Sequence, residues 1–202
     1  MGRLAYPPVT ELLLVRHGET DWNATRRWQG RDDPPLNARG IAQARELADA
    51  LAADDIAAVY TSDLRRALQT AEIVGERLGL EIVPLAELRE IDVGSWSGRR
   101  SADIEVEEPE AWARHVASWG TGWTDGETPE QLTARVVDAL RRISSERDEE
   151  RVLVVAHGGV IRALTAFALG VEFADFTRGS IVIANCSVAR FACESGEFRS
   201  LD

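Results

Sequence analysis

The sequence predicts an α/β fold, a three-layer α/β/α sandwich around a largely parallel central sheet. Short, nearly continuous apolar runs alternate with amphipathic helical patterns along the 202 residues, as expected for parallel strands that helices cover on both faces. Two of these runs end in His-Gly, at His17 and at His157. Because ligands bind beyond the carboxyl ends of the strands in such sheets, we expect the two imidazoles to meet at one sheet edge.

The strands are predicted from apolar, β-branched stretches that lack the alternation of a half-exposed strand. Chains of about 150 to 200 residues bury a full core, so residues 1–202 are predicted to form a single domain. In chain order the predicted strands cover residues 11–15, 57–60, 81–83, 151–156 and 180–183, with 188–193 as a further candidate.

Helical patterns connect these strands. The first follows Asn37, a predicted N-cap, and its apolar residues recur at the helical period. The second covers residues 63–78 and stops at Gly79, a residue type typical of a helix C-cap. The third runs from about 129 to 146, and the fourth begins just after Gly159.

Residues 97–126 differ from the rest of the chain. They contain Trp112, Trp119 and Trp123 together with glycines and acidic residues, and no strong strand pattern. We predict short helices and loops that form a lid over the site. Packing of the tryptophans on the surface, without substrate contact, is an equal alternative.

Composition excludes several classes of protein. A net charge of -11 argues against a nucleic-acid surface, which needs an excess of basic residues. Cys186 and Cys193 are too few for a disulfide framework and lack the spacing of a zinc site. No apolar stretch reaches membrane-spanning length, and the first ten residues do not resemble a signal peptide. We therefore expect a cytoplasmic protein without a membrane partner.

The two His-Gly turns carry the chemistry. A neutral imidazole nitrogen is a nucleophile toward phosphorus when nearby positive charge keeps it unprotonated, and Arg16 stands beside His17. Gly18 lets the backbone approach a phosphate closely. Phosphoryl transfer needs donors around the equatorial oxygens, so His157 is expected there as a charged donor. His115 lies in the polar lid segment and is assigned no chemical role.

Two neighbouring arginines follow the second predicted strand. Arg65 falls in the first turn of the next helix, where a bidentate guanidinium is suited to join a phosphate pocket. Arg66 lies about 100° further round the helix. It is therefore expected to be solvated or salt-bridged.

A proton donor is the remaining requirement. A phosphatase must protonate the leaving alcohol and later take a proton from water, a task for one carboxyl group of raised pKa. Glu87, Glu90 and Asp92 all have suitable chemistry. Sequence spacing does not choose among them.

Together these segments resemble the histidine phosphatase superfamily, also called the phosphoglycerate mutase-like family. The likeness covers nearly the whole chain, because the motifs occur in the family's order. They are Arg16-His17-Gly18-Glu19-Thr20, Gln29-Gly30, Ser62-Asp63-Leu64-Arg65-Arg66-Ala67, Leu88-Arg89-Glu90 and Ala156-His157-Gly158-Gly159.

The resemblance implies a phosphoglycerate mutase-like fold, no metal and no cofactor. It implies that His17 becomes phosphorylated and that Glu90 is the proton donor. The residues that it places around the phosphate with His17 are Arg16, Arg65 and His157. The residues that it places on the substrate or at the pocket rim are Asn23, Gln29, Gly30 and Gly158.

A phosphatase is favoured over a phosphoglycerate mutase. The mutases for which this family is named carry a larger insertion with extra basic residues after the proton donor. Residues 101–119 contain Arg114 as the one basic residue apart from His115. A non-catalytic phospho-ligand sensor is a second alternative, but it predicts the loss of a reactive residue. The expected partner is a small phosphorylated metabolite, and the oligomeric state stays open, with a homodimer as one alternative.

Overall fold

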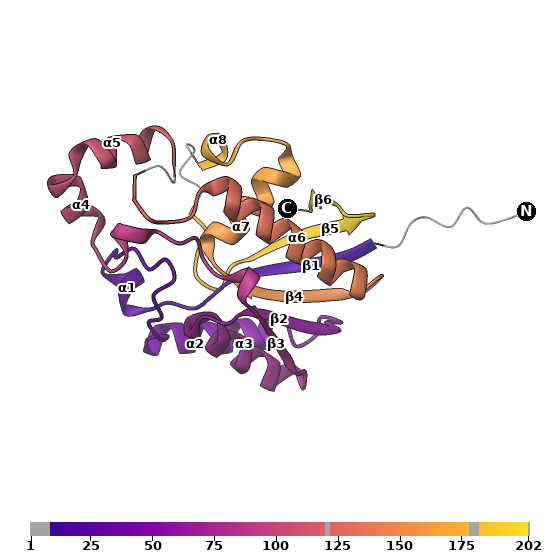
Figure 1. The fold of residues 1–202 in the computed structure, drawn as a ribbon. Helices are drawn as coiled ribbons and strands as arrows, with labels where there is room; N and C mark the ends of the chain where they lie inside the picture. The colour runs from indigo at the N-terminus through magenta and orange to yellow at the C-terminus, as the bar shows by residue number, and fades with distance from the viewer. Residues whose placement is uncertain (1–8, 120–121, 178–181, 202) are drawn as a thin grey trace, which may run out of the picture.

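The computed structural model of the chain describes residues 9–119, 122–177 and 182–201. These residues contain a six-stranded sheet with the order β3-β2-β4-β1-β5-β6 (Figure 1). The first four strands of the chain run parallel, and the last two pair antiparallel, so the predicted α/β fold with a largely parallel sheet is confirmed. The strands are β1 (Val9–Arg16), β2 (Ala58–Ser62), β3 (Ile82–Leu85), β4 (Arg151–Ala156), β5 (Val188–Glu194) and β6 (Glu197–Ser200).

Two features of the sheet differ from the prediction. The strand predicted at 180–183 is not found over Val182 and Ile183, while residues 180 and 181 lie outside the described part of the chain. The candidate strand at 188–193 is β5. β6 is an additional edge strand of largely polar sequence in which only Phe198 is buried, so it lacks the apolar pattern that identified the others.

Helices cover both faces of the sheet, as predicted (Figure 1). Asn37 is the N-cap of its helix and accepts a hydrogen bond from the Gly40 N–H at 2.9 Å. Gly79 ends its helix in the left-handed conformation, at φ 69°, which costs glycine little. The helices on one face are α2 (Ala38–Ala50) and α3 (Arg65–Leu78), and those on the other are α6 (Pro129–Glu146) and α7 (Gly158–Leu169).

β1 is held firmly between the two helical layers. Leu13 and Val15 belong to the core under α2 and α3, whereas Leu12 and Leu14 belong to the core under α6 and α7. All four side chains are at most 1% exposed. Burial of each of these side chains stabilises the fold by about 1.5–3 kcal/mol. The residues that follow β1 are therefore held by a well-packed strand.

A lid of short helices lies at the same end of the sheet as α1 (Figure 1). The short helices predicted for segment 97–126 correspond to α4 (Ser101–Glu107) and α5 (Pro109–Ala117). An isolated β-bridge between Arg27 and Arg100 joins this lid to the chain after α1. The remaining short elements are α1 (Asp21–Ala24), α8 (Phe173–Thr177) and 3-10 turns at Ala86–Leu88 and Gly94–Trp96.

An aromatic cluster fixes the lid to the body of the protein. His115, expected in a polar setting, is 7% exposed and lies among indole rings. Its ring centroid is 5.1 Å from that of Trp28 and 5.1 Å from that of Trp96. Burial lowers its pKa to about 4, so the ring is a neutral part of the lid core. The other rings within 6 Å of it are Trp112, Trp119 and Trp123.

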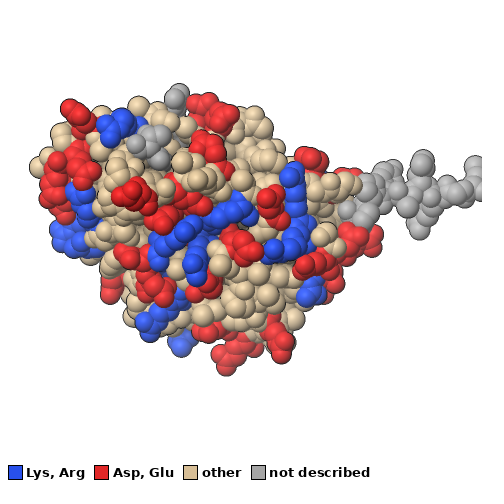
Figure 2. All heavy atoms as spheres, in the orientation of Figure 1, with Lys and Arg blue, Asp and Glu red and all other residues tan. Residues whose placement is uncertain are grey.

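The surface carries charges of both signs. Figure 2 shows arginines and carboxylates interspersed over one face, and every blue side chain is an arginine because the sequence contains no lysine. No single-sign basic surface of the kind that binds nucleic acid appears on this face. None of the helices within the described ranges is long and apolar enough to cross a membrane.

Candidate active site

The two His-Gly turns meet at one edge of the sheet, as expected. β1 and β4 are parallel neighbours in which Arg16 pairs with Ala156, so His17 and His157 follow at the same level. The His17 N–H donates to the Ala156 carbonyl at 3.0 Å, and the two ring centroids lie 5.2 Å apart. Both side chains are buried, with exposures of 2% and 0%.

The hydrogen bonds of His17 assign its tautomer. Nδ1 lies 2.7 Å from the Gly18 carbonyl oxygen, which only accepts, so Nδ1 carries the proton and Nε2 keeps its lone pair. Burial lowers the pKa of His17 well below its ordinary value, and the charges of Arg66 and Arg16 lower it further. His17 is therefore a neutral imidazole whose nucleophilic nitrogen, Nε2, is unprotonated.

His157 is neutral as well, which corrects the expectation of a charged donor. Burial lowers its pKa well below the ordinary value, and the positive charges nearby, Arg66 first, act in the same direction. Its Nε2 lies 2.8 Å from Ser62 Oγ, at the end of β2. Its Nδ1 is buried and has no hydrogen-bond partner among the described residues. A neutral ring still donates through one N–H, so His157 keeps the capacity to bind an oxyanion.

Arg66, not Arg65, reaches the site. Arg66 is 1% exposed, and its Nε donates to His17 Nε2 at 3.2 Å. Its two terminal nitrogens donate to the carbonyls of Asp32 (2.6 Å) and Gly30 (2.9 Å). Arg65 is exposed and is not among the residues that line the cavity, so the structure does not bring it to the expected phosphate pocket. The helix begins at Arg65, two residues later than the predicted start at residue 63, and Arg66 lies on the helix face that also buries Ala67 and Thr70.

Two further arginines border the same space. Arg16 Nη1 donates to the Ile183 carbonyl at 2.5 Å, while its buried Nε has no partner among the described residues. Arg162, which the sequence reasoning missed, lines the cavity from the second turn of α7. Burial lowers the pKa of both guanidiniums, which nevertheless remain cations. The signal for Arg162 was its spacing, one helical turn after Gly158.

Of the three carboxylates left open by the sequence, only Glu90 lines the cavity. Its carboxylate accepts from the Gly159 N–H at 3.1 and 3.2 Å and from the Ile91 N–H at 2.9 Å. Glu87 instead pairs with Arg142 on the surface, at 3.0 Å. Asp92 caps the Gly94 N–H. The structure thus brings Glu90 together with His17 and Arg16 in the cavity. His157 packs against His17 but is not among the lining residues.

The profile of the histidine phosphatase superfamily (branch 1) matches residues 12–202. The chain belongs to this superfamily. A probable phosphoglycerate mutase GpmB of Enterobacter sp. (strain 638) is 37% identical over 183 residues, covering 89% of this chain and 83% of the relative. A metal-independent phosphoserine phosphatase of Arabidopsis thaliana is 41% identical over 160 residues, covering 77% of this chain and 67% of the relative.

Solved structures agree with this assignment. A mycobacterial glucosyl-3-phosphoglycerate phosphatase superposes with a TM-score of 0.86 at 29% identity, covering 95% of this chain and 97% of that one. Bacillus stearothermophilus YhfR superposes with a TM-score of 0.86 at 33% identity, covering 95% of each chain. The phosphoglycerate mutase-like fold expected from the motifs is therefore confirmed.

Three of the four substrate-binding and rim residues expected for a histidine phosphatase line the cavity, and one does not. Asn23, Gln29 and Gly30 line the cavity. Thr20 Oγ1 lies 3.1 Å from both Asn23 Oδ1 and Gln29 Oε1, and its one hydroxyl hydrogen donates to either of the two amide oxygens. Gly158 is not among the lining residues, and Gly159 takes that place.

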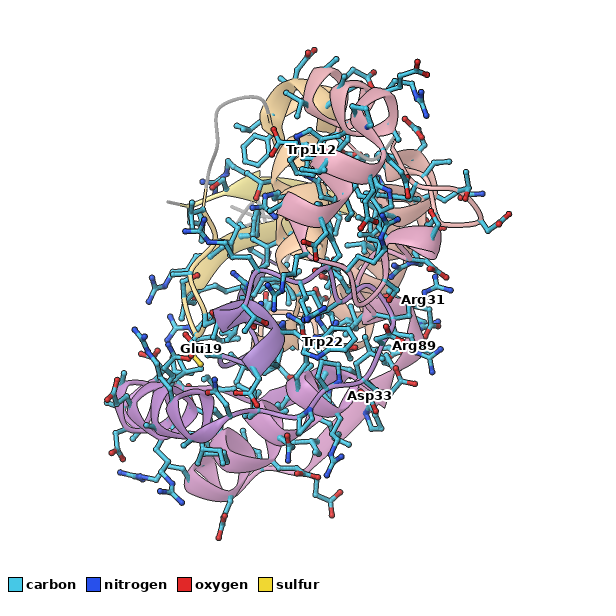
Figure 3. The ribbon with its side chains drawn as sticks, turned by 90° about the vertical axis from the view of Figure 1, so that its left-hand side faces the viewer. Glu19, Trp22, Arg31, Asp33, Arg89 and Trp112 are labelled. Atoms are coloured by element: carbon cyan, nitrogen blue, oxygen red, sulfur yellow. The ribbon has the colours of Figure 1, made fainter. Side chains whose placement is uncertain are left out.

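The histidine phosphatase cavity has a volume of about 320 Å³ and two chemically different parts. The inner part holds His17, Glu90 and three guanidiniums, those of Arg16, Arg66 and Arg162. In Figure 3 Trp22 lies centrally, between the lid that carries Trp112 and the layer of α2 and α3. Among the described residues, no three His, Cys, Asp or Glu side chains are arranged to hold a metal ion. The outer part is lined by Trp22, Arg26, Arg27, Trp28, Ser101 and Trp119.

Proposed function

We propose that this protein is a phosphatase that hydrolyses small-molecule phosphate monoesters through a phosphohistidine on His17, without a metal. The observation that carries the proposal is the state of His17. Its Nδ1 is bound to the Gly18 carbonyl and its Nε2 lone pair faces Arg66, in a cavity that also holds Glu90. A nucleophile, cations for the phosphate and a carboxyl group thus share one space.

In the first step His17 Nε2 attacks phosphorus in line with the leaving oxygen. The N–P bond forms as the bond from phosphorus to the alcohol oxygen breaks, and Glu90, in its protonated form, gives that oxygen a proton. The guanidiniums of Arg16, Arg66 and Arg162 stabilise the negative charge on the equatorial oxygens. The products are the alcohol and the phosphohistidine.

In the second step water takes the place of the alcohol. Glu90, now ionised, removes a proton from the water as it attacks phosphorus, and the N–P bond breaks. Phosphate leaves, and His17 and Glu90 return to their starting states. Glu90 therefore serves first as acid and then as base, as microscopic reversibility requires.

The lid favours water, and not a second hydroxyl group of the substrate, as the acceptor of the phosphoryl group. The relatives include proteins named as mutases and proteins named as phosphatases. The lid contributes Ser101 and Trp119 to the cavity wall, and neither is a cation suited to hold a substrate carboxylate in place. The proposal includes a small phosphorylated metabolite as partner. The proposal also includes a cytoplasmic location, and a homodimer is one alternative for the oligomeric state.

Phosphate release from a panel of monoesters, with chelator present, tests the proposal. The panel contains phosphoserine, 3-phosphoglycerate, glucosyl-3-phosphoglycerate, α-ribazole phosphate and p-nitrophenyl phosphate. We expect release that survives the chelator and is lost in His17→Ala, together with an acid-labile phosphoenzyme in the unchanged protein. Absence of release from every ester would contradict the phosphatase, and conversion of 3- to 2-phosphoglycerate would then support the mutase.

A further inference from the structure

Arg135, on α6, binds the backbone of the segment that carries Glu90. Its Nη1 donates to the carbonyls of Glu87 and Arg89, at 2.8 and 2.7 Å, and its Nη2 donates to the carbonyl of Glu90 itself, at 3.1 Å. One planar guanidinium thus binds three carbonyls in four consecutive residues. These are strong, charge-assisted hydrogen bonds, and their fork geometry fixes direction as well as distance.

The same guanidinium is itself held in place by a buried carboxylate. Arg135 Nε and Nη2 donate to the two carboxylate oxygens of Glu127, at 2.6 and 2.7 Å, and the side chains are only 18% and 9% exposed. Glu127 comes directly after the lid segment. Its N–H donates to the Asp92 carbonyl at 2.8 Å, and its own carbonyl accepts from Trp123 Nε1 at 3.2 Å.

We propose that the Arg135–Glu127 pair is a positioning device for Glu90, which ties the proton-donor loop to α6 and to the end of the lid. Arg135 is not among the cavity-lining residues, so it acts through Glu90 and not on the substrate. The proposal rests on the proposed function, since it assigns a role in the proton transfer of that reaction. An ångström of displacement of a catalytic group costs about 10²-fold in rate.

The matched control lies on the same helix. Arg142 also reaches the Glu87 segment, but it binds the Glu87 side chain at 3.0 Å on the surface, with exposures of 48% and 43%. Arg142→Met therefore removes one arginine from α6 and one contact to the same segment without freeing a backbone carbonyl. Only Arg135→Met releases the backbone of Glu90.

Aryl phosphates with phenols of different acidity separate positioning from folding. We expect Arg135→Met to lower kcat/KM for phenyl phosphate by about 10- to 100-fold. It should lower kcat/KM for p-nitrophenyl phosphate much less, since nitrophenolate leaves without a proton. Arg142→Met should change neither value. An equal loss for both esters would overturn the proposal, because a merely structural defect does not depend on the leaving group.

A double-mutant cycle with Glu90→Gln gives the second readout. If Arg135 acts through Glu90, then Arg135→Met should cost almost nothing further once the carboxyl group is gone. If the loss of kcat/KM in the double variant equals the product of the losses in Arg135→Met and Glu90→Gln, the proposal is overturned. Arg135→Met/Glu127→Gln, which leaves no buried charge unpaired, and Arg135→Lys, which retains the charge, replace Arg135→Met if that variant does not fold. If the unchanged protein hydrolyses no ester, it is the proposed function that fails.

Discussion

At the residue scale, Arg66 controls the reactive nitrogen of His17 directly. Its Nε is 3.2 Å from His17 Nε2, and the phosphate must enter beside this contact. Together with burial, the larger cause, the guanidinium keeps the imidazole unprotonated before substrate arrives, and it meets the equatorial oxygens afterwards. One side chain serves both purposes because it is buried and oriented by the carbonyls of Gly30 and Asp32.

Arg66→Met should therefore lower kcat by about 10²- to 10³-fold, the usual cost of a lost oxyanion donor. It should also lower stability by about 1–3 kcal/mol, because two carbonyls lose their donor. Steady-state kinetics with p-nitrophenyl phosphate and urea denaturation measure the two effects. The neighbouring variant Arg65→Met should behave like the unchanged protein, and a large loss of activity there would restore Arg65 to the pocket.

Arg65 and Arg66 show which features of the site can be predicted from the sequence at the scale of single residues. The motif contained both side chains, which lie about 100° apart around α3, and the packing of that helix decides which of them faces inward. Glu90 was identified by resemblance and not by spacing. Arg162 was missed because its spacing, one helical turn after Gly158, indicates a shared helix face but not the cavity which that face lines.

At the scale of elements, the N-terminus of α7 organises the proton donor. His157 is the N-cap of this helix, and the Gly159 N–H, one of its unpaired first donors, binds the Glu90 carboxylate. Gly159 also leaves the space that the carboxylate occupies, since a Cβ there would lie 2.2 Å from Glu90 Oε1. The first residues of α7 thus supply both the imidazole of His157 and the N–H group that binds the Glu90 carboxylate.

Gly159→Ala should displace the Glu90 carboxylate while leaving the fold intact, because the clash falls on the far end of a flexible side chain. We expect a loss of kcat of about 10²-fold for phenyl phosphate, by misplacement, and a smaller loss for p-nitrophenyl phosphate. The control is Gly158→Ala, whose Cβ would lie 3.3 Å from Arg162 Nη1. An equal effect of both alanines on kinetics would argue against a specific seat for Glu90.

Elements with a strong period were predictable, and those without one were not. Helix α6 covers Pro129–Glu146, the predicted span, because its apolar residues recur at the helical period and Thr128 caps it. β6 was not predicted, since an edge strand with one buried residue has little apolar pattern. The aromatic surroundings of His115 were also hidden, because they depend on Trp28 and Trp96 from outside the lid.

At the scale of the whole molecule, the chain buries all three of its histidines in neutral form. His17 and His157 lie at the sheet edge and His115 in the lid core, with exposures of 2%, 0% and 7%. Burial lowers the pKa of each below the ordinary value of 6.5, to about 4 for His115. Catalysis and lid packing therefore share one requirement, since both depend on imidazoles that stay unprotonated.

The stability of the folded chain should consequently fall as the pH is lowered from 7 to 5. In this range the unfolded chain binds protons at its histidines below pH 6.5 and the folded chain does not, so the free energy of unfolding decreases with falling pH. The slope is at most about 1.4 kcal/mol per pH unit for each histidine. Carboxyl groups of lowered pKa lose their contribution only near and below their ordinary values, which are 3.8 for Asp63 beside Arg89 and 4.5 for Glu87 and Glu108.

Urea denaturation at pH 7, 6 and 5 measures this slope, and His115→Phe isolates one of its three parts. Phenylalanine keeps an aromatic ring among the indoles and takes up no proton, so the variant should lose about a third of the pH dependence while retaining the lid. His17→Ala should also reduce the slope, although it abolishes turnover. A slope that stays the same in both variants would place the pH dependence elsewhere and contradict the neutral state assigned to these rings.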